Sequence, residues 1–439
     1  HVDYVLSHEL NPVRLGKTTP HRLSILLNSV DDGATHGFHF YGSDGVGDFK
    51  RDDVRFQEAA LQNFIDDARG TFNLASWGTT DAWQVGHNPN QSYRYADGRR
   101  DLDRLQGDLV NFARWGWTFY SALIDRLTGG VNQSDELARL MAKPGLIQIA
   151  LKASATYILP VALIYDYPLD TQLHSSLCDR FLTALNVGED LQTVPCFAGL
   201  CPNRGKLDVV CPSGFWGYRH EIGMPISLSP NPGANDAVSV IEYQPPLNLS
   251  ASVATDLALL TEHEKSLRAL VPGLACNIAQ SRDAVLAQLK RSEADVVYFY
   301  CHGGVSRSVP FLQVGPADNP GIIDASNLRA YKIRWSPLRP LVFINGCHTT
   351  AVAPDQAINF VSAFLEYSNA AGVIGTEITI FEPLARQFAE EYLRRFFAGA
   401  HLGEAIRGAR LALLASGNPL GLVYLPFAMA DLRLAAKDS

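Results

Sequence analysis

A regular alternation of apolar and helical segments in the second half of the chain constrains the fold most. Apolar runs at residues 249–254, 275–280, 296–301 and 341–345 alternate with helical patterns at 261–271, 282–291 and 356–368. The runs are apolar almost throughout, which predicts strands that are buried on both faces. Repeated strand–helix units of this kind predict an α/β fold with a mainly parallel central sheet between two layers of helices.

Other segments extend this pattern in both directions. An apolar run at 371–376 is followed by two long helical patterns, 383–399 and 402–416, and by a last apolar run at 422–428. Earlier in the chain we expect strands at 146–153, 159–169 and 207–211 and a helix within 171–185. Apolar residues recur at helical spacing from 102 to 127, which predicts one amphipathic helix that Gly116 can interrupt.

The first hundred residues differ in character. They contain short strand-like pieces separated by long polar segments rich in glycine and aspartate. We therefore expect a small strand-rich accessory lobe at 1–100, with a boundary near Arg100, and a main domain at 101–439.

Composition excludes several classes of protein. The chain has 439 residues, 47% of them hydrophobic and 19% charged, and a net charge of -8. These values are typical of a soluble globular protein and argue against a nucleic-acid-binding surface. No apolar stretch is long enough to cross a bilayer, and seven cysteines without regular close spacing favour a reducing, cytoplasmic location. Because the first residue is His1, we expect a trimmed or processed chain.

Two motifs place a cysteine beside a histidine where an apolar run gives way to glycine or a polar loop. The first is YCHGG at 300–304 and the second is GCHTT at 346–350. The carboxyl ends of parallel strands meet at one edge of a sheet, and neighbouring strands lie only about 5 Å apart. We therefore expect both motifs to reach a shared substrate.

A catalytic pair can be assigned from these motifs. We assign His302 as the base and Cys347 as the nucleophile, because an imidazole can take the proton of a thiol whose pKa is ordinarily about 8.5. Two glycines are expected to let the chain turn sharply after His302. The backbone N–H groups of Gly303 and Cys347 are candidates for an oxyanion hole.

Each assignment has a plainer alternative. A cysteine at a strand end, taken alone, is more often a buried core residue than a nucleophile. We expect Cys301 to be a core residue. His348 is a competing base, but in extended chain it points away from its neighbour Cys347.

A zinc site is a further alternative. Cys196, Cys201 and Cys211, with His220 downstream, are metal-ligating residue types. Their spacing lacks the short cysteine pair of common structural zinc sites, so we expect core thiols, no metal and no cofactor.

Several segments together resemble a known family. They are LPVALIYDYPLD, CPSGFWGYRH, the YCHGG and INGCHT pair, VIGTEITI and EAIRGARLALLASGNPLGLVYLPFA. In this order they resemble the CHAT domains of the caspase-like cysteine peptidases, the group of separases, legumains and gingipains. The resemblance runs from about Leu102 to Leu434.

This resemblance implies a caspase-like three-layer sandwich and a cysteine endopeptidase whose dyad maps onto His302 and Cys347. It further implies a degenerate N-terminal half at 101–230 and a catalytic half at 231–439. Members of the family are commonly inactive until a sensor or partner subunit engages them, often in bacterial antiviral defence. Their substrates include gasdermins and other effector proteins. The tetratricopeptide helices that often accompany such domains are not visible in this sequence.

Specificity and alternative functions stay open. An acidic residue in the first subsite favours a basic residue before the cut bond, and Glu377 is the main candidate because it interrupts an apolar run. Asp355 and Arg307 are further candidates for contacts with the substrate. A scaffold that binds a peptide in the same cleft, and a thiol-dependent acyltransferase or hydrolase of small molecules, are the alternatives to a protease.

Overall fold

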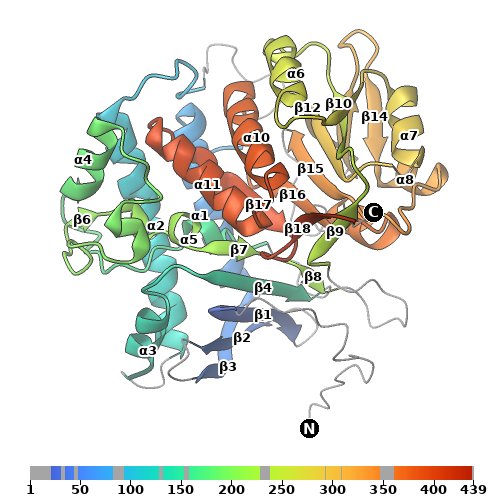
Figure 1. Ribbon diagram of the computed structural model, residues 1–439. Helices are drawn as coiled ribbons and strands as arrows, with labels where there is room; N and C mark the ends of the chain where they lie inside the picture. The colour runs from blue at the N-terminus through green and yellow to red at the C-terminus, as the bar shows by residue number, and fades with distance from the viewer. Residues whose placement is uncertain are drawn as a thin grey trace.

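The computed structural model describes residues 21–30, 35–43, 48–82, 93–127, 132–152, 158–227, 238–291, 293–307, 309–346 and 360–437. A central sheet occupies the second half of the chain (Figure 1). Its strands, in spatial order, are β11 (Ala275–Ala279), β10 (Asn248–Val253), β12 (Val296–Ser306), β15 (Leu341–Gly346), β16 (Gly372–Thr376) and β17 (Tyr424–Phe427). All neighbouring pairs are parallel except β16 with β17. The predicted α/β class and mainly parallel sheet are confirmed.

Helices cover both faces of this sheet, as the alternation predicted. One layer holds α6 (Leu260–Arg268), α10 (Glu382–Phe397) and α11 (Leu402–Ala415), and the other holds α7 (Arg282–Arg291), α8 (Ala325–Ala330) and a π-helical turn, Ala363–Tyr367. Successive side chains of β12 point to opposite layers, as its pleat requires. Tyr298 contacts His263 of α6, whereas Phe299 contacts Phe364 of the π-helical turn. The predicted three-layer sandwich is confirmed.

Strand β12 continues beyond the histidine motif. Its last five residues, 302–306, pair antiparallel with β13 (Val309–Val314), which in turn pairs with β14 (Gly321–Asp324). The expected sharp turn after His302 is therefore wrong, since the chain turns only after Ser306. Gly304 instead permits close packing, because a Cβ there would lie 2.7 Å from the Phe311 ring.

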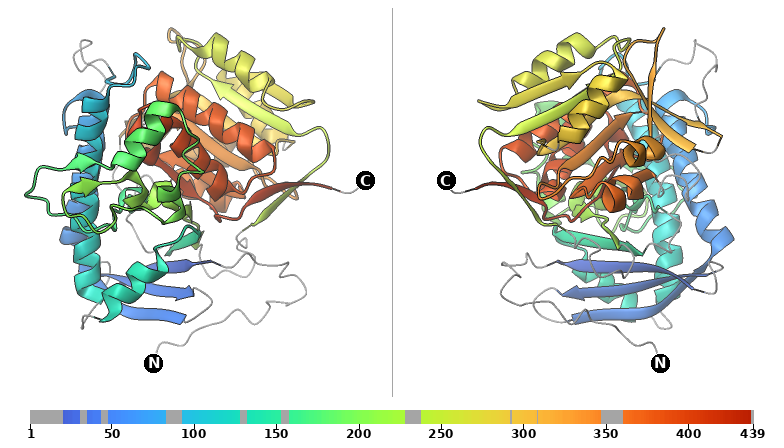
Figure 2. Two further views of the ribbon diagram at one scale, coloured as in Figure 1. Left: turned by 60° about the vertical axis from the view of Figure 1, so that its left-hand side comes forward. Right: turned by 90° about the vertical axis from the view of Figure 1, so that its right-hand side faces the viewer.

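A second sheet includes the strands of the strand-rich N-terminal region. Its order is β3 (Asp48–Gln57), β2 (Thr35–Ser43), β1 (Leu23–Val30), β4 (Leu146–Lys152) and β7 (Glu221–Gly223), with β8 (Ile226–Ser227) also beside β4. Helix α1 (Glu58–Trp77), which the sequence analysis did not predict, packs on α2 (Leu102–Leu127). Figure 2 shows this sheet and the two helices beside the central sandwich. The sheet takes strands from both sides of Arg100.

Helix α2 has the predicted bounds and runs through Gly116 without interruption. A Cβ at Gly116 would overlap the carbonyl oxygen of Leu163 and lie 2.7 Å from the Tyr165 Cβ. The glycine therefore allows a neighbouring segment to pack directly on the helix backbone. That segment, 159–169, is not the strand that its apolar residues predicted; residues Val161–Leu163 form a 3₁₀ turn instead.

Short elements make up the region between β4 and β7. They are the 3₁₀ turn Val161–Leu163, β5 (Ser176–Leu177), α4 (Asp179–Val187), the 3₁₀ turn Pro195–Ala198, β6 (Val209–Val210), the 3₁₀ turn Pro212–Gly214 and α5 (Trp216–Arg219). The other elements are α3 (Asn132–Leu140), β9 (Val240–Tyr243), the 3₁₀ turn Pro419–Val423 and β18 (Arg433–Ala436). In the part of the chain that the structure describes, none of the helices is both long and apolar enough to span a membrane.

Candidate functional site

The pairing of β12 with β15 brings the residues that precede His302 and Cys347 side by side. Cys301, the residue before His302, pairs with Gly346, the residue before Cys347. Neighbouring strands are separated by about 4.8 Å, so the chain leaves both positions at almost the same point. Cys347 itself lies outside the described residues, as do the competing base His348 and the subsite candidate Asp355.

His302 has a carboxylate partner that the sequence analysis missed. Its Nε2 lies 3.1 Å from both carboxylate oxygens of Asp256, and both side chains are about one-third exposed, at 37% and 34%. Such a carboxylate orients an imidazole and stabilises its protonated form. Because Nε2 faces Asp256, Nδ1 is the ring nitrogen that does not contact this carboxylate.

Asp256 reaches His302 because it follows the strand next to β12. The backbone N–H of Ala254 donates to the Tyr300 carbonyl at 3.0 Å, and that of Thr255 donates to the Gly315 carbonyl at 2.9 Å. These bonds fix the chain between β10 and Asp256. The carboxyl ends of parallel strands meet at one edge of a sheet, and this rule led us to expect His302 and Cys347 close together. The same rule applies to Asp256, which lies three residues after the end of β10.

A buried hydrogen-bond network holds the end of β15 in place. The Asn345 side-chain amide donates to the Tyr298 hydroxyl at 2.8 Å and to the Ala385 carbonyl at 2.7 Å, and its oxygen accepts from the Tyr424 hydroxyl at 2.8 Å. Burial raises the pKa of Tyr298 well above its ordinary value, so this hydroxyl stays neutral. The network ties β12, β15, β17 and α10 together two residues before Cys347.

The other residues assigned near His302 differ in their surroundings. Cys301 is buried in the core, as expected. Gly303 pairs with Leu312 in the hairpin of β12 and β13. Arg307 lies at the exposed tip of this hairpin, with a positive φ of 50°. The hairpin therefore places Arg307 five residues beyond the histidine, on the surface.

Glu377 follows β16 directly and is fully buried. Arg69 of α1 is its partner, with 3.3 Å between the arginine Nε and a carboxylate oxygen. Burial raises the pKa of Glu377 to about 7 in spite of this arginine. The partner comes from a helix that the sequence did not predict, so nothing in the sequence pointed to the pair.

The segment 215–220 is a packing centre. Burial lowers the pKa of His220 well below its usual range, and the Arg219 Nε donates to the His220 Nε2 at 3.1 Å. Arg219 also forms a buried ion pair with Asp166. The sequence analysis considered three cysteines together with His220. These residues, Cys196, Cys201 and Cys211, cluster with Cys178 instead.

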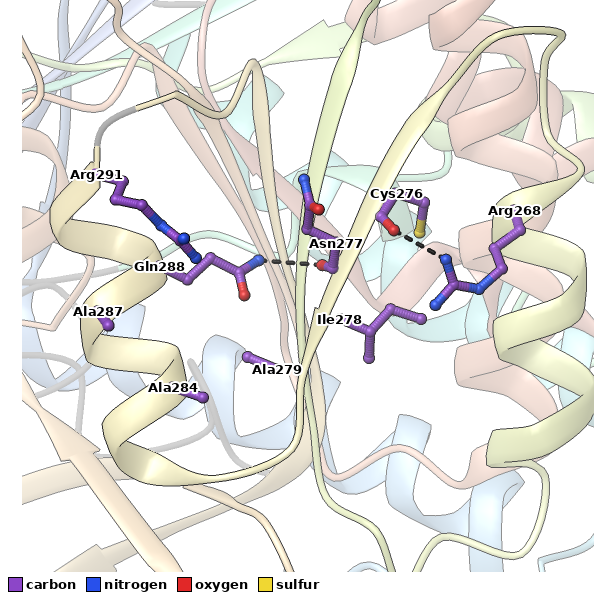
Figure 3. A pocket seen from close by; sticks show the side chains of 9 residues that line it. All are labelled: Arg268, Cys276, Asn277, Ile278, Ala279, Ala284, Ala287, Gln288 and Arg291. Atoms are coloured by element: carbon purple, nitrogen blue, oxygen red, sulfur yellow. Dashed lines mark hydrogen bonds between the residues drawn. The ribbon is translucent and has the colours of Figure 1, made fainter.

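A pocket of about 570 Å³ lies over the edge strand β11 (Figure 3). Its lining does not include His302, Asp256 or Glu377. Side chains from α6 and α7 bind the backbone of this strand. Arg268 donates to the Cys276 carbonyl at 3.0 Å, and Gln288 donates to the Asn277 carbonyl at 3.0 Å (Figure 3). The Arg268 contact shields a carbonyl that an edge strand would otherwise offer to another chain.

Comparison with known proteins gives one family match and one close relative. Residues 244–423 match the model of the CHAT domain. A curated protein of Vitiosangium sp. (strain GDMCC 1.1324), named "Probable protease", is 43% identical over 450 residues. The alignment includes 100% of this chain and 57% of that protein, so the chain spans little more than half of its relative's length.

Two solved structures show weaker similarity, each at 9% identity. One is the Arg-specific cysteine proteinase gingipain R, with a TM-score of 0.36 over 86% of this chain and 75% of that chain. The other is the Saccharomyces cerevisiae separase–securin complex, with a TM-score of 0.43 over 94% of this chain and 30% of that chain. The first match agrees with the family predicted from the sequence motifs: residues 244–423, which include β10, β12, β15 and β16, are similar to the CHAT domain.

Proposed function

We propose that this chain is a cysteine endopeptidase in which Cys347 is the nucleophile and His302 is the base. One observation supports the proposal: Cys301, the residue before His302, pairs in parallel with Gly346, the residue before Cys347 in the sequence. The CHAT match and the relative named as a protease support it. A scaffold that only bound a peptide would need neither a thiol at 347 nor a carboxylate-paired histidine.

In the proposed reaction, His302 removes the thiol proton through Nδ1 as Cys347 attacks the peptide carbonyl. Asp256 stabilises the imidazolium that forms, because its carboxylate lies 3.1 Å from Nε2. The imidazolium then protonates the departing amine, and water hydrolyses the resulting thioester. The N–H groups of Gly303 and Cys347 are the proposed oxyanion donors, each worth roughly 3 kcal/mol of transition-state stabilisation.

We further propose that Glu377 selects a basic residue in the substrate. It follows β16, the strand beside β15, and its carboxylate already accepts a hydrogen bond from an arginine of another element. A substrate arginine or lysine would make the same type of contact once Arg69 moved away. Arg307 and Asp355 are weaker candidates for contacts at the edges of the same cleft.

The biological setting is also part of the proposal. By analogy with CHAT peptidases, the enzyme stays inactive until a sensor or partner subunit engages it, and it acts in the cytoplasm in antiviral defence. A gasdermin or another effector protein encoded nearby is the proposed substrate. The accessory lobe at 1–100 and the degenerate half at 101–230 are the proposed sites of the activating input.

The test compares the wild-type chain with its Cys347→Ala variant. Each is incubated with the proteins encoded beside it in its genome, and the new N-termini are sequenced. We expect termini that require Cys347, with cleavage reduced on the order of 10⁴-fold or more in the variant. Cys301→Ala, at the buried neighbouring cysteine, is the matched control and should retain cleavage. Identical patterns from wild type and Cys347→Ala would refute the peptidase and favour the scaffold.

A further inference from the structure

Four buried cysteines converge at one point between β4 and β7. They are Cys178, Cys196, Cys201 and Cys211, whose sulfur atoms all lie within 4.8 Å of one another. Three are fully buried and Cys201 is 8% exposed. The chain has seven cysteines, so more than half of them share this site. Such crowding is not a general property of buried thiols, which are small apolar residues that can pack anywhere in a core.

The sulfur atoms lie close enough together to share one tetrahedral metal ion. A Zn–S bond of about 2.3 Å places sulfurs about 3.8 Å apart in a tetrahedron. The Sγ atoms of Cys178 and Cys201 are 3.9 Å apart. A disulfide would require about 2.05 Å, and all four cysteines are free thiols in the structure. An iron–sulfur cluster would put several atoms between the cysteines, which the 4.8 Å limit does not allow.

The surroundings of the sulfurs suit thiolates. The Asn203 side-chain amide donates to the Cys178 Sγ at 3.2 Å, and the Asn203 backbone also hydrogen-bonds Cys201. The Ser213 hydroxyl lies 3.1 Å from the Cys211 Sγ. Hydrogen bonds of this kind orient metal-bound thiolates and offset part of their charge. Cys178 also precedes the first turn of α4, where the helix dipole favours a negative group.

A metal ion bound by the four sulfurs would join several short elements of the chain. Each cysteine lies in or beside a short element: α4, the 3₁₀ turn Pro195–Ala198, the turn that follows it, and the two-residue strand β6. The β5–β6 pairing has only two residues per strand, so few backbone pairs join these pieces of chain. A metal that joins four separate pieces of chain would add stability to the region.

We propose that Cys178, Cys196, Cys201 and Cys211 bind one structural Zn²⁺ ion through four thiolates. The proposal revises the expectation that this chain holds no metal. The spacing argument considered three cysteines with His220, whereas the fourth ligand in this proposal is Cys178, which precedes α4. The inference is independent of peptidase activity.

The test is the metal content of the purified full-length chain, measured by mass spectrometry of the elements. We expect about one zinc ion per chain, lost to below about one-tenth in Cys178→Ser and in Cys211→Ser. Cys276→Ser, at a half-buried cysteine on β11, is the matched control and should keep the ion. Zinc retained by both cluster variants would overturn the proposal.

A second measurement covers the case in which the cluster variants fail to fold. The wild-type chain is denatured without reductant in the presence of an alkylating agent, and its cysteine peptides are identified. We expect zinc in the native chain and alkylated thiols at all four positions. Disulfides among the four, iron in place of zinc, or no metal in the wild-type chain would each refute the site.

Discussion

Glu377 is a fully buried carboxyl group whose partner is Arg69. Burial raises its pKa from 4.5 to about 7 in the folded chain. The folded state therefore binds this proton more tightly than the unfolded state does. Its contribution to stability is complete below about pH 4.5 and is lost as the pH rises through about 7. With about 1.4 kcal/mol for each pKa unit, the loss is roughly 3 kcal/mol.

Glu377→Gln should remove this pH dependence. The amide keeps the shape of the side chain but has no proton to release. The free energy of unfolding of the variant, measured relative to that of wild type, should therefore increase by roughly 1 to 3 kcal/mol as the pH rises from about 5 to about 8. Unfolding by denaturant at several pH values measures the difference. Glu293→Gln, at an exposed glutamate, is the control and should follow wild type. Parallel curves for wild type and Glu377→Gln would contradict the raised pKa.

Single residues also show which parts of the site were predictable. His302 was assigned from its motif alone, and Asp256 obeys the same strand-end rule although the sequence analysis did not apply it. Arg69 was beyond prediction, because its contact with Glu377 joins residues 308 positions apart. Cys178 was missed for a related reason: its three partners lie 18 or more residues away along the chain.

At the scale of elements, helix α2 contains two glycines with different surroundings. Gly116 and Gly107 both lie within this helix, where alanine is intrinsically more stable than glycine by roughly 1 kcal/mol. A Cβ at Gly107 would meet nothing within 4 Å, whereas one at Gly116 would overlap the Leu163 carbonyl and lie 2.8 Å from the Tyr165 nitrogen. Alanine substitutions at the two positions therefore measure the effects of helix propensity and of packing on stability separately.

The two alanine variants should change stability in opposite directions. Gly107→Ala should stabilise the chain by about 0.5 to 1 kcal/mol, through helix propensity alone. Gly116→Ala should destabilise it by roughly 1 to 3 kcal/mol, because backbone atoms must move to admit the methyl group. Denaturant unfolding of both variants is the measurement. A stabilising effect of Gly116→Ala would show that the helix and segment 159–169 do not pack as described.

Elements were predicted well where the apolar period was unambiguous. The bounds of α2 and the order of the central strands β10, β11, β12, β15 and β16 follow from the sequence pattern, which did not predict β13, β14 or α8. Segment 159–169 was wrongly predicted because an apolar run of that length is compatible with several buried conformations. The hairpin after His302 was missed because its pairing partner, β13, lies beyond the turn and fixes the conformation of the two glycines.

At the scale of the whole molecule, the two sheets form one connected structure. The backbone N–H of Met224, next to β7, donates to the Pro426 carbonyl of β17 at 2.8 Å, and Gln148 of β4 accepts from the Ala430 backbone at 3.1 Å. Arg69 and Glu377 add a link between α1 and the end of β16. The N-terminal half is therefore joined to the central sheet by direct contacts at β17, at Ala430 and at the end of β16. Such contacts between distant segments were not predictable from local patterns.

The central claim is that the paired ends of β12 and β15 place His302 where it activates Cys347. The most direct measurement is the rate at which iodoacetamide alkylates Cys347 as a function of pH, read by peptide mass spectrometry so that Cys276 and Cys301 serve as internal controls. This measurement needs no substrate.

We predict that Cys347 of the wild-type chain reacts with a midpoint below the value of about 8.5 for a free thiol. His302→Ala should raise the midpoint to about that value, and Asp256→Asn should raise it by a smaller amount, because the imidazolium loses its carboxylate partner. If the profiles of wild type and His302→Ala coincide, with Cys347 reacting as an ordinary thiol, the proposed catalytic pair is contradicted.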